Sequence, residues 1–131
     1  MKKRIRVGKS TDGLVGKNKN NKPRNYAVID EDENGSIVVS KITSHDKDNP
    51  SNVRKEKFGL RKAVKSFGEN SYIDVTLYIE TRNKEPIKER DLDYDIINNF
   101  EFNISESRTI RRFIFKKIRN RERYKKFKNK K

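Results

Sequence analysis

The chain has 131 residues, of which 31% are hydrophobic and 40% are charged, and its formal net charge is +15. This length suits one domain, and the low apolar content predicts a small core with part of the chain outside it. Cysteine is absent, which excludes disulfide bonds, a thiolate nucleophile and cysteine-ligated metal centres, and the single histidine cannot build a histidine metal site. No cofactor is therefore expected.

The positive charge is concentrated at the two ends. Residues 1–24 contain nine Lys or Arg and one Asp, residues 108–131 contain thirteen and one Glu, and residues 25–107 contain twelve basic and seventeen acidic residues. Such clusters predict a polyanionic partner, RNA first with DNA as the alternative, while solubilising arms are the simpler interpretation. No apolar run approaches the ~18 residues of a membrane span, so a cytoplasmic protein without a membrane partner is expected.

Three segments are predicted along the chain. Residues 1–22 have the composition of a flexible basic arm, residues 23–104 form a small β-rich core domain, and residues 105–131 form a basic C-terminal helix and tail. The expected fold class is α+β: a small antiparallel sheet or SH3-like barrel with one or two helices.

Residues 25–44 predict a β-hairpin. Asn34-Gly35 favours a two-residue type I′ turn, because that turn needs positive φ at both central positions. In this register Tyr26 faces Thr43, and Arg24 faces His45. Alternation then places these four side chains on one face of the hairpin, whereas the opposite face carries Ala27, Ile29, Val38 and Ile42.

Further elements are predicted from hydrophobic periodicity. Apolar residues at helical spacing predict a helix within 54–67, and strict alternation predicts a strand over 72–81. A short strand is expected over 100–104, followed by a helix with Ser105 as its N-cap and Glu106 in its first turn. The stripe that docks this helix on the sheet consists of Ile110, Phe113, Ile114 and Ile118.

Two motif resemblances do not support a site. Gly8-Lys9-Ser10-Thr11 resembles the end of a phosphate-binding P-loop, but Lys3 occupies the position of the required first glycine. The acidic residues 30–33 lack the ligand spacing of a calcium loop, which favours a solvated hairpin tip.

The open end of the hairpin carries the candidate catalytic residues Arg24, Thr43, Ser44 and His45. Hydroxyl groups and a guanidinium can hold a phosphate, and the guanidinium can stabilise the extra negative charge of a pentacovalent transition state. A histidine can transfer protons. These groups suffice for metal-independent RNA cleavage by the ribose 2′-hydroxyl, and the alternative is that they only bind phosphate.

The basic ends supply the candidate nucleic-acid-binding residues. Their cations are expected to contact phosphates, and the tyrosine to stack on a base. They are Lys22, Arg111, Arg112, Lys116, Lys117, Arg119, Arg121, Arg123 and Tyr124.

The pattern R-N-Y-A-V-I-x5-G-S-I-V-V-S-K-I-T-S, which runs from Arg24 to Ser44, is similar to the core of PemK/MazF-like toxins. The resemblance implies an SH3-like barrel, often dimeric, with metal-independent endoribonuclease activity that an antitoxin, either a protein or an RNA, restrains. Arg24 then matches the catalytic arginine, Thr43 the threonine, and Ser44 a supporting phosphate contact. Asn25 departs from the proline that usually follows the arginine.

Two other functions remain open from the sequence. One is a non-enzymatic DNA- or RNA-binding protein of a phage, plasmid or other mobile element, which works through its basic arms. The other is a protein that binds a ribonucleoprotein such as the ribosome.

Overall fold

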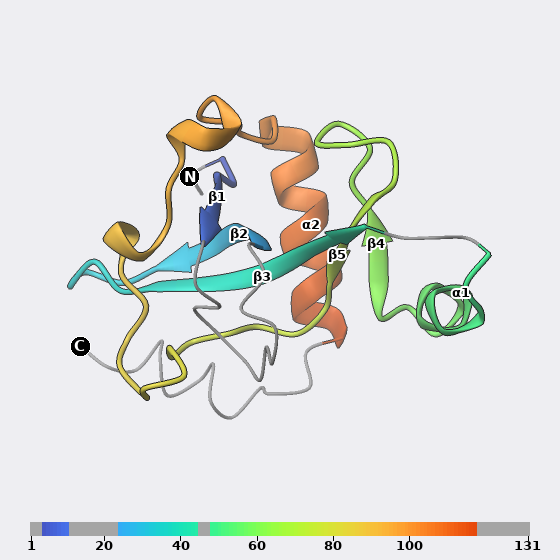
Figure 1. Cartoon of the computed structure of the whole chain (residues 1–131), viewed down its shortest axis with the longest axis horizontal. Helices are drawn as coiled ribbons and strands as arrows, with labels where there is room; N and C mark the ends of the chain where they lie inside the picture. The colour runs from blue at the N-terminus through green and yellow to red at the C-terminus, as the bar shows by residue number, and fades with distance from the viewer. Residues whose placement is uncertain (1–3, 11–23, 45–47, 118–131) are drawn as a thin grey trace.

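The computed structural model describes residues 4–10, 24–44 and 48–117 (Figure 1). Within them, five strands form one antiparallel sheet in the order β1-β2-β3-β5-β4. The strands are β1 (Val7–Ser10), β2 (Arg24–Glu31), β3 (Ile37–Ser44), β4 (Arg61–Ala63) and β5 (Ser71–Asp74). The helices are α1 (Pro50–Lys57) and α2 (Ile104–Lys117), with short 3₁₀ turns η1 (Glu89–Asp91) and η2 (Asp95–Ile97). The predicted α+β class is confirmed, in the form of a small antiparallel sheet.

The turn of the β2–β3 hairpin is longer than predicted. Asp32 N donates to Ser36 O at 2.9 Å, so residues 33–35 close the loop, and Gly35 has a φ of +79°. The Asp32 carboxylate accepts hydrogen bonds from the N–H groups of Asn34 and Ser36, both at 2.9 Å. This side chain stabilises a three-residue loop with one left-handed residue. The predicted type I′ turn is therefore wrong.

A β-bulge at Ile29 shifts the hairpin register again. Val28 pairs with Val39, whereas Asp30 pairs with Val38, so Ile29 has no direct partner. The longer loop and the bulge each move the predicted pairing by one residue. A shift of two residues changes the partners but returns each side chain to its predicted face.

The predicted partners are consequently wrong while the predicted core face is right. Tyr26 pairs with Lys41 and not with Thr43. The four side chains predicted to lie on the face opposite Arg24 and Thr43 all belong to one buried cluster. They are Ala27, Ile29, Val38 and Ile42.

Apolar side chains cover both faces of the sheet. Helix α2 crosses one face (Figure 1), where Ile110 and Ile114 are buried in the larger cluster. The opposite face carries a second cluster, in which side chains of the hairpin pack against Ile87 and Leu92. The hairpin contributes Tyr26, Val28, Ile37 and Val39 to this cluster.

Residues 4–10 belong to the folded domain. Ile5 and Val7 are fully buried, and Lys9 exchanges backbone hydrogen bonds with Asp93, both at 2.8 Å. The prediction of a flexible arm over residues 1–22 is wrong for this segment, because β1 is an essential part of the core. Residues 11–22 lie outside the described residues.

The segment predicted as a helix over 54–67 divides differently. Helix α1 ends at Lys57, Gly59 takes a φ of +68°, and β4 follows. The strand predicted over 72–81 is confirmed only for its first part, since β5 ends at Asp74 and isolated bridges continue from it.

Helix α2 begins close to its predicted start. Asn103 is its cap, because its Oδ1 accepts from Glu106 N at 2.7 Å, so the prediction of Ser105 as the cap is wrong. Glu106 lies in the first turn, as predicted. The strand expected over 100–104 is reduced to one bridge between Glu101 and Arg6.

Candidate nucleic-acid interface

Arg24 and Thr43 lie on the same sheet face, at the ends of neighbouring strands. Asn25 pairs with Ile42, so Arg24 and Thr43 are the next pair outward in that register. On its other side Thr43 pairs with Tyr72 of β5. Since Asn25 and Ile42 alternate onto the α2 side, Arg24 and Thr43 are on the opposite face. Both residues are half-buried.

The other two candidate catalytic residues are placed differently. Ser44 pairs with Ser71 and is exposed, and its side chain alternates to the α2 side of the sheet. The Thr43 hydroxyl donates to the Ser44 carbonyl at 3.3 Å. The structure thus brings Arg24 together with Thr43 but not with Ser44, and His45 lies outside the described residues.

A row of charged side chains lies beside this pair. Lys41 precedes Thr43 by two residues and shares its face, and the Lys41 ammonium is 3.8 Å from Asp74 Oδ2. Asp74 Oδ1 accepts from Arg61 Nε at 2.9 Å, and Arg61 Nη1 donates to Asn52 Oδ1 of α1 at 2.8 Å. Sequence reasoning missed these residues. The two-residue spacing of Lys41 from Thr43 in a strand was the signal that would have found the lysine.

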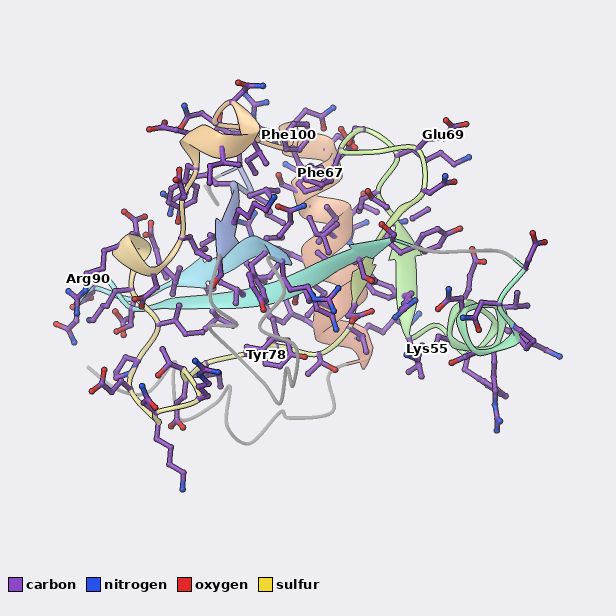
Figure 2. The ribbon with its side chains drawn as sticks, viewed as in Figure 1. Lys55, Phe67, Glu69, Tyr78, Arg90 and Phe100 are labelled. Carbon is purple, nitrogen blue, oxygen red and sulfur yellow. The ribbon has the colours of Figure 1, made fainter. Side chains whose placement is uncertain are left out.

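Two tyrosines adjoin the charged row on this face. Burial raises the pKa of Tyr26 to about 12, and Tyr78 adds to the rise while the Arg24 guanidinium opposes it. Burial also raises the pKa of Tyr78, and the negative charge of Asp74 contributes. Both phenols therefore stay protonated at neutral pH. Figure 2 shows Tyr78 next to β3, to which its backbone is bonded at Val39.

The arginines of α2 form a second cationic surface. One flank of the helix borders a groove of about 290 Å³ that is lined by Ile104, Arg108, Arg111, Arg112 and Phe115. Arg111 Nε donates to Ile29 O at 3.0 Å, which fixes this flank against β2. Arg108 and Arg112 are exposed. Arginines around an apolar floor suit a ligand that carries both phosphates and rings.

The predicted nucleic-acid-binding residues are only partly within the described chain. Arg111 and Arg112 line the groove, Lys116 is exposed, and Lys117 ends α2 without a described side chain. Because α2 packs on the face opposite Arg24, the two cationic surfaces are on different sides of the sheet. The predicted residues outside the described ranges are Lys22, Arg119, Arg121, Arg123 and Tyr124.

Comparisons with known proteins do not assign the chain to a family. The sequence matches no family model and no curated protein, and the structure matches no solved structure. In the described residues, no group of three or more acidic or histidine side chains is arranged to hold a metal ion. None of the described helices is long and apolar enough to cross a membrane. Function must therefore be inferred from the side chains of the chain itself.

Proposed function

We propose that this protein binds RNA and cleaves it without a metal ion, as an endoribonuclease. The observation that supports this best is the hairpin register, which beyond the Asn25–Ile42 pair continues to Arg24 and Thr43, with Lys41 two residues from Thr43 on the same face. A guanidinium, an ammonium and a hydroxyl are the donors that bind the oxygens of one phosphate. The formal charge of +15 favours a polyanionic substrate.

In the proposed reaction the ribose 2′-oxygen attacks the adjacent phosphorus, and the bond to the 5′-oxygen of the next nucleotide breaks. The products are a 2′,3′-cyclic phosphate and a 5′-hydroxyl end. Arg24 stabilises the extra negative charge on phosphorus, and the Thr43 hydroxyl exchanges its 3.3 Å hydrogen bond to the Ser44 carbonyl for one to a non-bridging oxygen.

One proton must leave the 2′-hydroxyl, and one must reach the departing 5′-oxygen. Tyr26 cannot remove the first, because its pKa of about 12 keeps the phenol protonated. We assign both transfers to His45: its neutral imidazole accepts the proton of the 2′-hydroxyl, and the resulting imidazolium donates that proton to the departing 5′-oxygen.

The roles proposed for Arg24 and Thr43 agree with the resemblance of the segment from Arg24 to Ser44 to PemK/MazF-like toxins. On that basis we propose a cytoplasmic toxin that an antitoxin, protein or RNA, restrains, and that acts as a homodimer.

The test is incubation of the purified protein with end-labelled single-stranded RNA in EDTA. We expect discrete products with cyclic-phosphate ends from the wild type, and at least a hundredfold slower cleavage by Arg24→Ala and Thr43→Val, as for loss of one transition-state donor (about 10²–10³). Arg90→Ala is the matched control, because Arg90 is exposed at the hairpin end of the molecule (Figure 2). Cleavage that Arg24→Ala leaves unchanged, or that EDTA abolishes, would refute the proposal.

A second candidate is a nucleic-acid-binding protein without catalysis, and the arginine groove of α2 favours it. RNA that is bound but left intact by both the wild type and Arg24→Ala would select this function. In that case the double variant Arg108→Gln/Arg112→Gln should lose most of the affinity, because these exposed guanidinium groups would be the main phosphate contacts.

A further inference from the structure

Helix α1 stands apart from the rest of the molecule. Figure 1 shows it beyond β4 at one end of the long axis, and none of its residues is buried. Val53 is 46% exposed, and Phe58, directly after the helix, is 58% exposed. Phe58 is the most exposed large apolar side chain of the described residues, and Val53 lies close to it in the chain, so the two offer an apolar contact to a partner at this end of the molecule.

The ends of α1 are well defined although the helix buries nothing. Asn49 caps its N-terminus. Gly59, with a φ of +68°, ends it in a Schellman motif, in which Leu60 N donates to Lys55 O at 2.8 Å. Phe58 is therefore held by a rigid local structure and not by a frayed helix end.

Two side-chain hydrogen bonds tie α1 to the candidate site. Asn52 accepts from Arg61 at 2.8 Å, and Glu56 Oε2 accepts from the Tyr72 hydroxyl at 2.9 Å. Tyr72 is in turn the strand partner of Thr43. Helix α1 is therefore hydrogen-bonded to the side chain of Tyr72, which lies next to Thr43 in the sheet, and to Arg61 of β4.

We propose that α1 and Phe58 form a second contact for a single RNA strand, with one base stacked on the Phe58 ring. The phosphates on either side would contact Arg54, Lys55 and Lys57. This inference rests on the proposed RNA binding and adds the direction in which the strand leaves Thr43.

The charges around Phe58 favour RNA over a protein partner. Arg54, Lys55 and Lys57 are exposed, while the acidic Glu56 is hydrogen-bonded to the sheet. Figure 2 shows Lys55 on the side of α1 next to β4, where it lines a hollow together with Asp74 and Thr76. The Arg54 guanidinium carbon lies 5.8 Å from the centroid of the Phe58 ring. A ring flanked by cations is the usual platform for single-stranded nucleic acid, whose bases are free to stack.

The test is fluorescence anisotropy with a short fluorescein-labelled single-stranded RNA in EDTA, on the Arg24→Ala protein so that the strand stays intact. Phe58→Leu keeps an apolar side chain and removes the ring, and we expect about five- to tenfold weaker binding, the lower end of the loss for one stacked base. Phe58→Tyr keeps the ring and should bind as the parent does. Ile96→Ala is the control, since Ile96 is 50% exposed in η2, at a different part of the fold.

A direct signal comes from 2-aminopurine placed in the RNA, because stacking on an aromatic ring quenches its emission. We expect quenching by the parent protein and by Phe58→Tyr, and none by Phe58→Leu. Equal affinity and equal quenching for Phe58→Leu and the parent would overturn the inference. RNA that is bound through Phe58 but never cut by the wild type would leave it standing and refute only the nuclease proposal.

Discussion

Arg61 and Asp74 form an ion pair across β4 and β5, in which Arg61 Nε donates to Asp74 Oδ1 over 2.9 Å. The side chains are only 7% and 18% exposed. Asp74 also lies 3.8 Å from the Lys41 ammonium, and Arg61 also donates to Asn52. The pair therefore joins the candidate phosphate site to α1 and fixes the edge strand β4.

Replacement of Asp74 should destabilise the fold. Asp74→Asn leaves the buried Arg61 guanidinium without a counter-charge, and we expect a loss of about 3 kcal/mol in the free energy of unfolding. Urea unfolding followed by circular dichroism measures it. The matched control is Glu101→Gln, which breaks the exposed Arg4–Glu101 pair and should cost less than about 1 kcal/mol. Equal losses in the two variants would show that the Arg61–Asp74 pair has no special structural role.

Gly8 should be intolerant of any side chain for reasons of packing. A Cβ at Gly8 would lie 2.7 Å from Leu92 Cβ and 3.0 Å from a Tyr94 ring carbon, so Gly8→Ala should cost about 1–3 kcal/mol. Gly35→Ala is the comparison, because nothing lies within 4 Å of its Cβ and only its φ of +79° opposes alanine. Thermal unfolding of both variants tests this, and a neutral Gly8→Ala would contradict it.

The parts of the fold that depend on local periodicity were predictable. Alternation along the hairpin gave its two faces, and the stripe with Ile110 and Ile114 gave the docking side of α2. The shared face of Arg24 and Thr43 follows from the same alternation. That prediction is confirmed because the loop and the bulge each shift the register by one residue, and a total shift of two residues leaves every side chain on its predicted face.

The parts that depend on distant partners were not predictable. Apolar residues do recur at helical spacing within 54–67, but Gly59 ends α1. Residues 61–63 form β4 instead, because Arg61 pairs with Asp74 of β5. The hairpin loop was mispredicted for a local reason, because the Asp32 carboxylate, just before Asn34-Gly35, binds the N–H groups of Asn34 and Ser36 and so favours a three-residue loop. The ion pair of Lys41 with Asp74 could not be predicted either, because the two residues are far apart in sequence, although the spacing of Lys41 from Thr43 did indicate their shared face.

The stability of the fold should fall at high pH because of Tyr26. Its pKa rises from 10 in the unfolded chain to about 12 in the folded protein. The unfolded state thus releases the proton first, and stability that is complete below pH 10 is lost as the pH rises through 12, by about 2–3 kcal/mol in total. Urea unfolding between pH 8 and pH 11 should show a smaller decline for Tyr26→Phe than for the wild type. An identical decline would mean that Tyr26 titrates normally.

Lys41 should contribute one phosphate contact to RNA binding. Lys41→Gln is expected to lower the slope of log affinity against log salt by about 0.7, the value for one contact on a single strand. Lys88→Gln is the matched control, because the Lys88 ammonium donates to the tip of the hairpin, to Asn34 O at 3.1 Å and Ser36 Oγ at 2.9 Å, and so is not expected to contact RNA. Anisotropy titrations at several salt concentrations provide the slopes. The same slope for Lys41→Gln and the wild type would remove Lys41 from the interface.

The two cationic surfaces should act independently, since they lie on opposite faces of the sheet. Lys41→Gln weakens one, and Arg112→Gln weakens the groove beside α2. If each surface holds a different part of the RNA, the double variant should show the sum of the two losses in binding free energy, within about 0.5 kcal/mol. The measurement is the affinity of the four proteins for one RNA at fixed salt. A double variant no weaker than the worse single variant would contradict independent binding by the two surfaces.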